Sequence, residues 1–427
     1  MESNIKTKTI NNSSYTYLII FLLGLTLLII YRGPDYIRLW TVFPEKPGFG
    51  LDFKAYQNGS SALYNKRHDI IYNVEKLREW NKSRGEKTRL GCEYPPLLFV
   101  IYLPFALLKP SQSIWLNFYL SHLILCLNII LLLSVRAKTW GIRKTIIIFL
   151  MALPVSFLFS PTIDCLFAGQ LSIIMLFLVT LFSIFYAKGK KIISTFILAF
   201  SISLKIFPVI FLVYFLVKRD YKSIITTLIF LILLMLPVII YTGSIHIYIA
   251  YLSNTPKSIY FDYVANQSLS ACINGYFKTT DYRTPLINSP LTGNILIWLI
   301  TFFIFYVTLK PVKIKCNTEK IYLEIGTFIL LLLICIPRSW PHYHMYLLLT
   351  LFLIYLGIEH NIQSKSQYFI LYLILFFVTG LIDGEVAGIT KDIILRIYLL
   401  KYHLIFYLLL FLWFTSIFIL TKVEQND

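Results

Sequence analysis

The stretch Leu51–Lys109 opens with LDFKAYQNGSSALYN at residues 51–65 and closes with EYPPLLFVIYLPFALLK at residues 93–109. It is the one long polar insertion in the first half of a chain that is otherwise largely apolar, and it lies beyond the first apolar run. Asp52 stands near its start, after the turn-forming tripeptide Gly48-Phe49-Gly50. A carboxylate close to a membrane crossing is costly unless it is paired or functional. The insertion therefore marks where a polar site is expected, and the apolar remainder indicates the fold class.

The composition is typical of an integral membrane protein. Of the 427 residues, 57% are hydrophobic and only 14% are charged. A helix needs about 20 apolar residues to cross a bilayer, and helices satisfy all their backbone polar groups internally. Long apolar runs recur along the whole chain, among them 17–31, 116–135, 146–159 and 224–241. We therefore predict an all-α, polytopic transmembrane protein with about ten full crossings, forming one integral membrane domain over residues 1–427.

The formal net charge of +18 does not indicate nucleic-acid binding, because the basic residues occur in short clusters between apolar runs. Such clusters are expected in cytoplasmic loops, and the densest short one lies between Arg136 and Lys144. The N-terminal apolar run has no small-residue cleavage site after it, which indicates an uncleaved anchor. Counting crossings from the basic loops predicts a multi-pass protein of the cell membrane.

The segment Ile192–Val217 has basic residues on both flanks, and Lys205 and Pro208 interrupt its middle. One straight crossing would place one basic flank outside and reverse every later helix. A re-entrant hairpin of two short helices, folded at Lys205–Pro208, keeps both flanks inside, and irregular backbone at this depth is tolerated where protein encloses it. We favour the hairpin, and the single crossing remains the alternative.

With that hairpin, the first helix covers about residues 15–31, and a long first extracytoplasmic loop covers residues 32–112. Within this loop, Pro95–Lys109 is too short and too rich in proline for an easy crossing, so it is expected to lie in the interface or to form a partial helix. Residues 160–164 are expected to be an outside turn before a crossing at 165–186. A second extracytoplasmic loop covers 242–290, and residues 391–401 are expected to form an amphipathic turn on the membrane surface.

This topology places the unusual polar residues on one side of the membrane, where we expect one outward-facing polar cavity. They are Asp52, Tyr56, Tyr94, Asp164, Gln170, Asn266, Gln267, Arg338, His342 and His344, with Lys205 joining them if the tip of the hairpin points into the cavity. For each of these residues, capping of a helix or local pairing is an open alternative to a functional role.

Asp52 and the basic residues suggest complementary roles. Asp52 precedes Tyr56 at helical spacing, and a carboxylate at such a junction can accept a proton from an attacking hydroxyl; the alternative role is an ordinary N-cap. Arg338, His342 and His344 can bind a phosphate leaving group, and so can Lys205. The alternatives are snorkelling of the basic side chains to the interface and metal binding by the histidines.

Two further motif classes are missing or weak. The six cysteines show no CxxC spacing, so a bridge between Cys92 and Cys272 is the less favoured alternative to unpaired thiols. No Asp-x-Asp, Walker or Rossmann pattern occurs, which disfavours a reaction driven by a nucleotide sugar or by ATP.

Several of these residues belong to short motifs that occur in a fixed order. They are Asp52-Phe53 with Tyr56 and Gly59, Leu63-Tyr64, Tyr94-Pro95-Pro96, Leu103-Pro104-Phe105-Ala106, Gly169-Gln170, Leu204-Lys205 with Pro208, Asn266-Gln267-Ser268, and Ser339-Trp340 with His342-Tyr343. In this order and spacing the chain resembles glycosyltransferase family 87, whose members use polyprenyl-phosphate sugars. The resemblance spans nearly the whole chain. It departs from the family pattern at Cys92-Glu93, in the charged insertion between Asp52 and Tyr94, and at the second histidine, His344.

The resemblance implies a GT-C membrane fold and an inverting reaction without a metal or another cofactor. A hydroxyl of a glycan or glycolipid acceptor would attack a sugar, commonly mannose, that is carried on a polyprenyl phosphate, itself a membrane lipid. The residue matching Asp52 would be the base, and the residue matching His342 would lie at the active site. Two other functions stay open: a flippase or transporter of lipid-linked glycans, which should show internal repeats and no large loop after the first helix, and a non-catalytic membrane protein of polysaccharide assembly, in which Asp52 would be dispensable.

Overall fold

The computed structural model describes residues 2–42, 44, 48–85, 91–254, 265–280, 284–285, 287–358, 366–382 and 402–424, and in these residues it is helical without strands. Seven of its helices are long and apolar enough to cross a membrane, and four shorter apolar helices accompany them. The all-α, multi-pass prediction is thus confirmed in its class. The number of about ten crossings stays a prediction.

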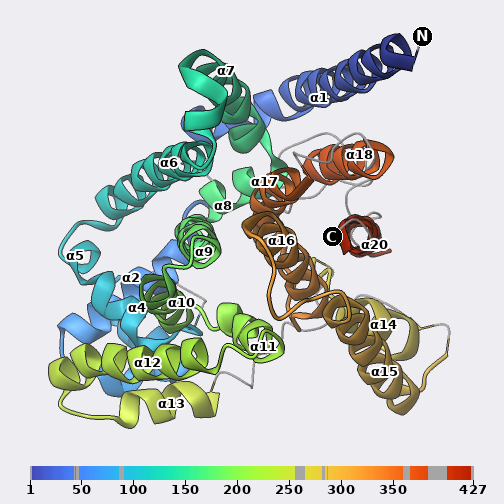
Figure 1. Ribbon diagram of the computed structural model, residues 1–427. Helices are drawn as coiled ribbons and strands as arrows, with labels where there is room; N and C mark the ends of the chain where they lie inside the picture. Colours follow the sequence, from blue (N-terminus) through green and yellow to red (C-terminus); the bar gives the residue numbers. More distant parts are fainter. Residues whose placement is uncertain are drawn as a thin grey trace. The chain divides into compact units, whose positions relative to one another are not determined.

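The chain forms two compact units, which we call the first and the second unit. The first consists of Met1–Thr41, Leu132–Asp164 and Tyr260–Asp427, and the second of Val42–Leu131 and Cys165–Ile259. The chain passes between the units at four points, two of which lie within the helices α6 (Pro110–Ser134) and α8 (Ser160–Ala168). Figure 1 labels the helices of both units.

The first unit is built on packed apolar helices. Within it α16 packs against α17 and α20, α1 packs against α18 and α7, and α14 packs against α15. Their bounds are α1 Glu2–Thr41, α7 Ala137–Leu158, α14 Leu269–Phe277, α15 Pro290–Leu309, α16 Thr318–Cys335, η6 Pro341–Tyr346, α17 Leu347–Ile358, α18 Ser366–Ile382 and α20 Leu404–Glu424. The buried Trp413 of α20 donates from Nε1 to Thr308 Oγ1 of α15 at 2.9 Å, so its one polar atom is satisfied inside the apolar interior.

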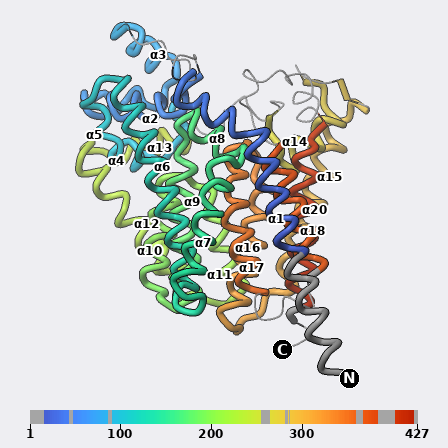
Figure 2. Tube along the Cα trace, turned by 90° about the horizontal axis from the view of Figure 1, so that it is seen from above, coloured from blue at the N-terminus to red at the C-terminus, as the bar shows by residue number. Residues whose placement is uncertain are grey.

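In the second unit the helices α2, α3, α4, α5 and α13 lie at one end, and α10 and α12 run away from them (Figure 2). Here α2 packs against α4 and α5, while α10 packs against α9, α12 and α4. The bounds are α2 Leu51–Tyr64, η2 His68–Ile70, α3 Val74–Ser83, α4 Pro96–Ile101, α5 Leu103–Ala106, α9 Ser172–Ala187, α10 Lys191–Leu204, η3 Phe207–Val209, α11 Ile210–Val217, α12 Tyr221–Thr242 and α13 His246–Asn254. The partial helix predicted at residues 95–109 is present as α4 and α5.

The first helix extends ten residues farther than the sequence predicts, because α1 ends at Thr41 and not at Tyr31. The charges that suggested a loop are paired: Arg32 Nη1 lies 3.1 Å from Asp35 Oδ2, and Arg32 also donates to the carbonyl of Leu381. Paired charges can be buried in a helix at far lower cost than single ones. The long polar insertion therefore begins near residue 42, and it contains helices rather than irregular loop.

The turn predicted at residues 160–164 and the crossing predicted at 165–186 are also different in the structure. Residues 160–168 form α8, the helical structure is interrupted at Gly169, and α9 starts at Ser172. Gly169 has a φ of +69°, and a Cβ there would lie 2.7 Å from the Cβ of Phe53, so the break requires glycine. This break places Gln170 at the head of α9.

The segment after α9 folds back on itself, as the hairpin prediction requires. Helix α10 ends at Leu204, Lys205 is extended with φ −154° and ψ 121°, and α11 begins at Ile210. The two ends of the segment meet, since Lys191 Nζ lies 3.0 Å from Asp220 Oδ2. The predicted second loop at 242–290 contains α13 and α14, while the predicted turn at 391–401 lies outside the described residues.

Candidate active site

The first turn of α2 presents Asp52 at the start of the polar insertion. Gly50 is the N-cap, with a φ of +65°, and its N–H donates to the carbonyl of Phe167 at 2.8 Å. Asp52 is thus the second residue of the helix, and the alternative that it serves as the N-cap is wrong. The N-terminal end of a helix favours a negative charge, so this position supports an ionised carboxylate.

A chain of hydrogen bonds fixes the Asp52 carboxylate. Gln170 Nε2 donates to Asp52 Oδ2 at 2.6 Å, and the Tyr56 hydroxyl donates to Gln170 Oε1 at 3.0 Å. The backbone N–H of Leu171 donates to the Tyr56 oxygen at 3.3 Å. Because the phenol proton goes to the carbonyl oxygen of Gln170, the amide nitrogen must face the carboxylate. The orientation of Gln170 is therefore set by both of its partners.

Tyr94 and Lys205 complete this cluster in the second unit. The hydroxyl oxygens of Tyr56 and Tyr94 lie 3.1 Å apart, and their rings meet edge to face with centroids 4.6 Å apart. The backbone carbonyl of Tyr94 accepts from the hydroxyl of Tyr72 at 2.7 Å. The buried Lys205 places its Nζ 5.7 Å from the centroid of the Tyr94 ring. Three places where a helix begins or ends thus meet in this cluster: the start of α2, the break between α8 and α9 at Gly169, and the break after α10 at Lys205.

Burial raises the pKa of Asp52 from its ordinary 3.8 to about 6, against the lowering effects of the Gln170 hydrogen bond and of the Lys205 charge. Glu93 adds a smaller upward effect through its negative charge. Burial and the neighbouring Tyr94 and Asp52 also raise the pKa of Tyr56, so its phenol stays protonated and keeps donating to Gln170. The cluster therefore holds a carboxyl group whose pKa is matched to accepting a proton near neutral pH.

Sequence reasoning did not identify the residues that support α2 from behind. Gln57 Nε2 donates to Ser113 Oγ at 2.9 Å and to the carbonyl of Phe105 at 3.2 Å. The signal of Gln57 in the sequence is weak, because a glutamine within a helix reads as an ordinary surface residue. Glu93 was visible beside Tyr94, but its effect on Asp52 depends on the fold.

The six cysteines are free thiols, and the alternative of a Cys92–Cys272 bridge is wrong. Cys92 is buried and its thiol donates to the carbonyl of Ala55 in α2 at 3.4 Å. Burial raises the pKa of Cys92 to about 12, which keeps the thiol protonated and unreactive. Its role here is to hold the backbone of α2.

A separate polar cluster lies in the first unit and joins residues 266–268 to residues 337–339. Asn266 Oδ1 accepts from the backbone N–H of Ser339 at 2.9 Å and of Ser268 at 3.2 Å, and Asn266 Nδ2 donates to the carbonyl of Pro337 at 2.9 Å. The N–H of Gln267 donates to the carbonyl of Ser339 at 2.8 Å. Asn266 and Gln267 are fully buried. These bonds make Asn266 a cross-link that shapes the 337–344 segment.

The basic residues of that segment differ in exposure. His344 is fully buried, with Nε2 3.0 Å from Ser339 Oγ, whereas Arg338 and His342 are partly exposed. His342 packs its ring against Tyr343 with centroids 4.7 Å apart. Arg338 and His342 are therefore the basic residues of this segment with access to a ligand. Asp164 is buried within α8 and not in a loop.

Within the described ranges, no group of three or more His, Cys, Asp or Glu side chains has the arrangement of a metal site. The sequence model of glycosyltransferase family 87 matches residues 93–356. This match includes Tyr94, Gln170 and Lys205, and it begins after Asp52 and Tyr56. No curated protein and no solved structure matches the chain.

Proposed function

The chain belongs to glycosyltransferase family 87 and is therefore a membrane glycosyltransferase, and we propose that it transfers a sugar from a polyprenyl phosphate to a hydroxyl of a glycan or glycolipid acceptor. Mannose is the sugar that we propose for the donor. The observation that carries this proposal is the Asp52 carboxylate, held by Gln170 at 2.6 Å with its pKa raised to about 6 by burial.

In the proposed reaction Asp52 is the general base. A carboxyl group with a pKa of about 6 is about nine-tenths ionised at pH 7, and it takes up a proton more readily than an exposed aspartate. Among the described residues, the hydrogen bond to Asp52 is made through Oδ2, so Oδ1 is available to an acceptor hydroxyl. That hydroxyl loses its proton to Asp52 as its oxygen attacks the anomeric carbon. The bond from this carbon to the phosphate oxygen breaks, and the configuration inverts.

The leaving group is the polyprenyl phosphate, which takes both electrons of the broken bond and so leaves with one more negative charge than it carries in the donor. Lys205 is the cation of the Asp52 cluster, and we propose that it contacts this phosphate, since its charge acts on the same site as Asp52. We propose that Tyr94 positions the sugar, because its hydroxyl contacts that of Tyr56 and its ring lies beside Lys205. Arg338 and His342 are the accessible basic residues of the 337–344 segment in the first unit, and their role as phosphate ligands stays a prediction from the sequence. The mechanism needs no metal or cofactor.

The proposed site faces the extracytoplasmic side of the cell membrane. Helix α10 has 14 residues, so about 20 Å separates its basic start at Lys191 from its end beside Lys205. Basic flanks of short loops are retained in the cytoplasm. The flanks at residues 188–191 and 218–222 meet at the base of the hairpin, which puts the Asp52 cluster at the opposite end of the second unit.

The test uses the full chain in proteoliposomes with a panel of synthetic polyprenyl-phosphate sugars and a glycolipid acceptor. We expect turnover with one sugar, loss of turnover in Asp52→Asn, and retained turnover in the control Asp69→Asn, which changes an exposed aspartate of the same unit. Turnover by Asp52→Asn at the wild-type rate would remove Asp52 from the mechanism. Chelator treatment is expected to leave the rate unchanged.

A further inference from the structure

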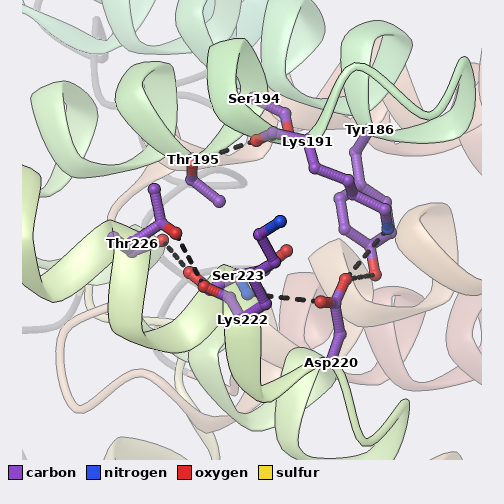
Figure 3. Close-up of polar contacts among 9 residues, drawn as sticks. Tyr186, Lys191, Ser194, Thr195, Asp220, Lys222, Ser223 and Thr226 are labelled. Atoms are coloured by element: carbon purple, nitrogen blue, oxygen red, sulfur yellow. Dashed lines mark hydrogen bonds and ion pairs between the residues drawn. The ribbon is translucent and has the colours of Figure 1, made fainter.

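The base of the hairpin holds a cluster that the proposed reaction does not use (Figure 3). Lys191 Nζ lies 3.0 Å from Asp220 Oδ2, and the Tyr186 hydroxyl donates to the same oxygen at 3.1 Å. Asp220 Oδ1 accepts from the backbone N–H of Ser223 at 3.2 Å and so caps α12. The Lys191 ammonium also lies 3.3 Å from the centroid of the Tyr186 ring. We call Tyr186, Lys191 and Asp220 the clasp.

The clasp is electrically balanced. Partial burial alone would raise the pKa of Asp220, but Lys191 and the hydrogen bonds from Ser223 hold this pKa below its ordinary value. Asp220 is therefore ionised at neutral pH, and its charge matches that of Lys191. The clasp closes the hairpin without adding net charge.

Four more cations surround the clasp and give this end of the second unit its positive charge. Lys188 and Lys190 lie on the turn between α9 and α10, Arg219 lies on the turn between α11 and α12, and Lys222 lies in the first turn of α12. All four are exposed, and none forms an ion pair within the part of the chain that the structure describes. The two turns that carry these residues are far apart in sequence, and the Lys191–Asp220 contact brings them together. We call these four residues the hairpin-base patch.

Exposed apolar side chains border the hairpin-base patch on the same helices. Ile192 of α10 is 65% exposed, Leu216 of α11 is 54% exposed and Ile225 of α12 is 58% exposed. In a membrane protein such side chains face hydrocarbon, so the change from Lys190 to Ile192 and from Lys222 to Ile225 marks the edge of the bilayer core. A cation at this level lies at the depth of lipid headgroups.

We propose that the hairpin-base patch binds the headgroup of an anionic phospholipid. The anionic phosphate of the headgroup would lie between the two cationic turns, and the acyl chains would run along Ile192, Leu216 and Ile225. A lipid fits this surface better than free phosphate does, because the cations continue directly into exposed apolar surface. The site lies at the end of α10 away from Lys205 and is independent of the proposed reaction.

The test compares lipids retained by the full chain in nanodiscs that contain equal amounts of phosphatidylglycerol and phosphatidylcholine. The variant Lys188→Gln/Lys190→Gln/Lys222→Gln removes three exposed charges from the patch. The control Lys76→Gln/Lys82→Gln/Lys109→Gln removes three exposed charges elsewhere in the same unit. The readout is the ratio of the two phospholipids that co-purify, measured by mass spectrometry. Each lysine near an anionic surface contributes about fivefold in affinity.

We expect the wild type and the control to enrich phosphatidylglycerol, and the patch variant to lose this enrichment by at least about tenfold. Equal loss in the patch and control variants, or no enrichment by the wild type, would overturn the proposal. A second measurement uses the wild type alone. Raising the salt concentration should reduce the enrichment of phosphatidylglycerol, whereas glycerol phosphate at the same concentration as the lipid phosphate should not. Displacement by glycerol phosphate would assign the patch to soluble phosphates instead.

Discussion

Replacing Gln170 with Met tests how the protein sets the basicity of Asp52. Methionine keeps nearly the same length but removes the amide that donates to Asp52 Oδ2 at 2.6 Å. That hydrogen bond lowers the pKa of Asp52 against the upward effect of burial. Its loss should therefore raise the pKa above about 6. The expected result is that the acidic limb of the pH–rate profile moves upward.

The size of this movement follows from the hydrogen bond. A bond to a charged group contributes about 1.5–3 kcal/mol, and about 1.4 kcal/mol corresponds to one pH unit. The limb should move from about 6 to between about 7 and 8. At pH 7 the rate of Gln170→Met should fall to about half to one tenth of the wild-type rate, and it should recover above pH 8.5 or so.

The assay measures kcat/KM for sugar transfer between pH 5 and pH 9 in proteoliposomes. Gln57→Met is the matched control, because it removes an equally buried amide of α2 whose partners are Ser113 and Phe105 and not Asp52. It should lower stability without moving the limb. A Gln170→Met rate that is reduced equally at every pH, with the limb unmoved, would refute the role of Gln170 in tuning Asp52.

Four other predictions concern charge and stability. Asp52→Asn should raise the midpoint of thermal unfolding in detergent at pH 7.5 while abolishing transfer. Because the pKa of Asp52 is raised from 3.8 to about 6, the free energy of unfolding falls as the pH rises between these two values. Removing the charge should restore up to about 3 kcal/mol, or about 3 °C for a chain of this length, and no gain at pH 7.5, or an equal gain at pH 4, would contradict this. Lys205→Met should move the acidic limb of the pH–rate profile upward, because the charge of Lys205 lowers the pKa of Asp52, and Glu93→Gln should move the limb downward, because the charge of Glu93 raises this pKa. Limbs at the wild-type pH in both variants would argue against both effects. Asp220→Ala should lower the free energy of unfolding by about 1–2 kcal/mol through the lost cap and the partly exposed ion pair, measured by chemical denaturation in detergent with Asp69→Ala as the control. Asn266→Ala should lower the free energy of unfolding by about 2–4 kcal/mol, because two buried N–H groups lose their acceptor and the carbonyl of Pro337 loses one of its donors. A loss below about 1 kcal/mol would show that Asn266 is no cross-link.

The sequence alone was enough for the helical class, the membrane setting and the family. Long apolar runs can satisfy their backbone only as helices, so the class follows from composition and run length. The hairpin at Lys205 could also be predicted, because basic residues on both flanks of one apolar segment conflict with a single crossing. Asp52 and Tyr56 share one face of α2 because they are four residues apart, which is a local property.

The contacts between these residues depended on the tertiary structure. Arg32 looked like the start of a loop, and only its partners Asp35 and Leu381 show why α1 continues to Thr41. The break at Gly169 follows from the close approach of Phe53, which no local pattern contains. Similarly, His344 reads as a phosphate ligand in the sequence, but it is buried against Ser339.

The charge state of Asp52 shows the same division. The sequence supplied a carboxyl group at the start of a helix, and that position alone would lower its pKa. Only the packing of α2, the Gly169 break and the Lys205 break into one cluster provides the burial that raises the pKa to about 6. Periodicity and composition are local and can be read along the chain, whereas burial and hydrogen-bond partners arise between segments more than 100 residues apart, as for Asp52 and Gln170.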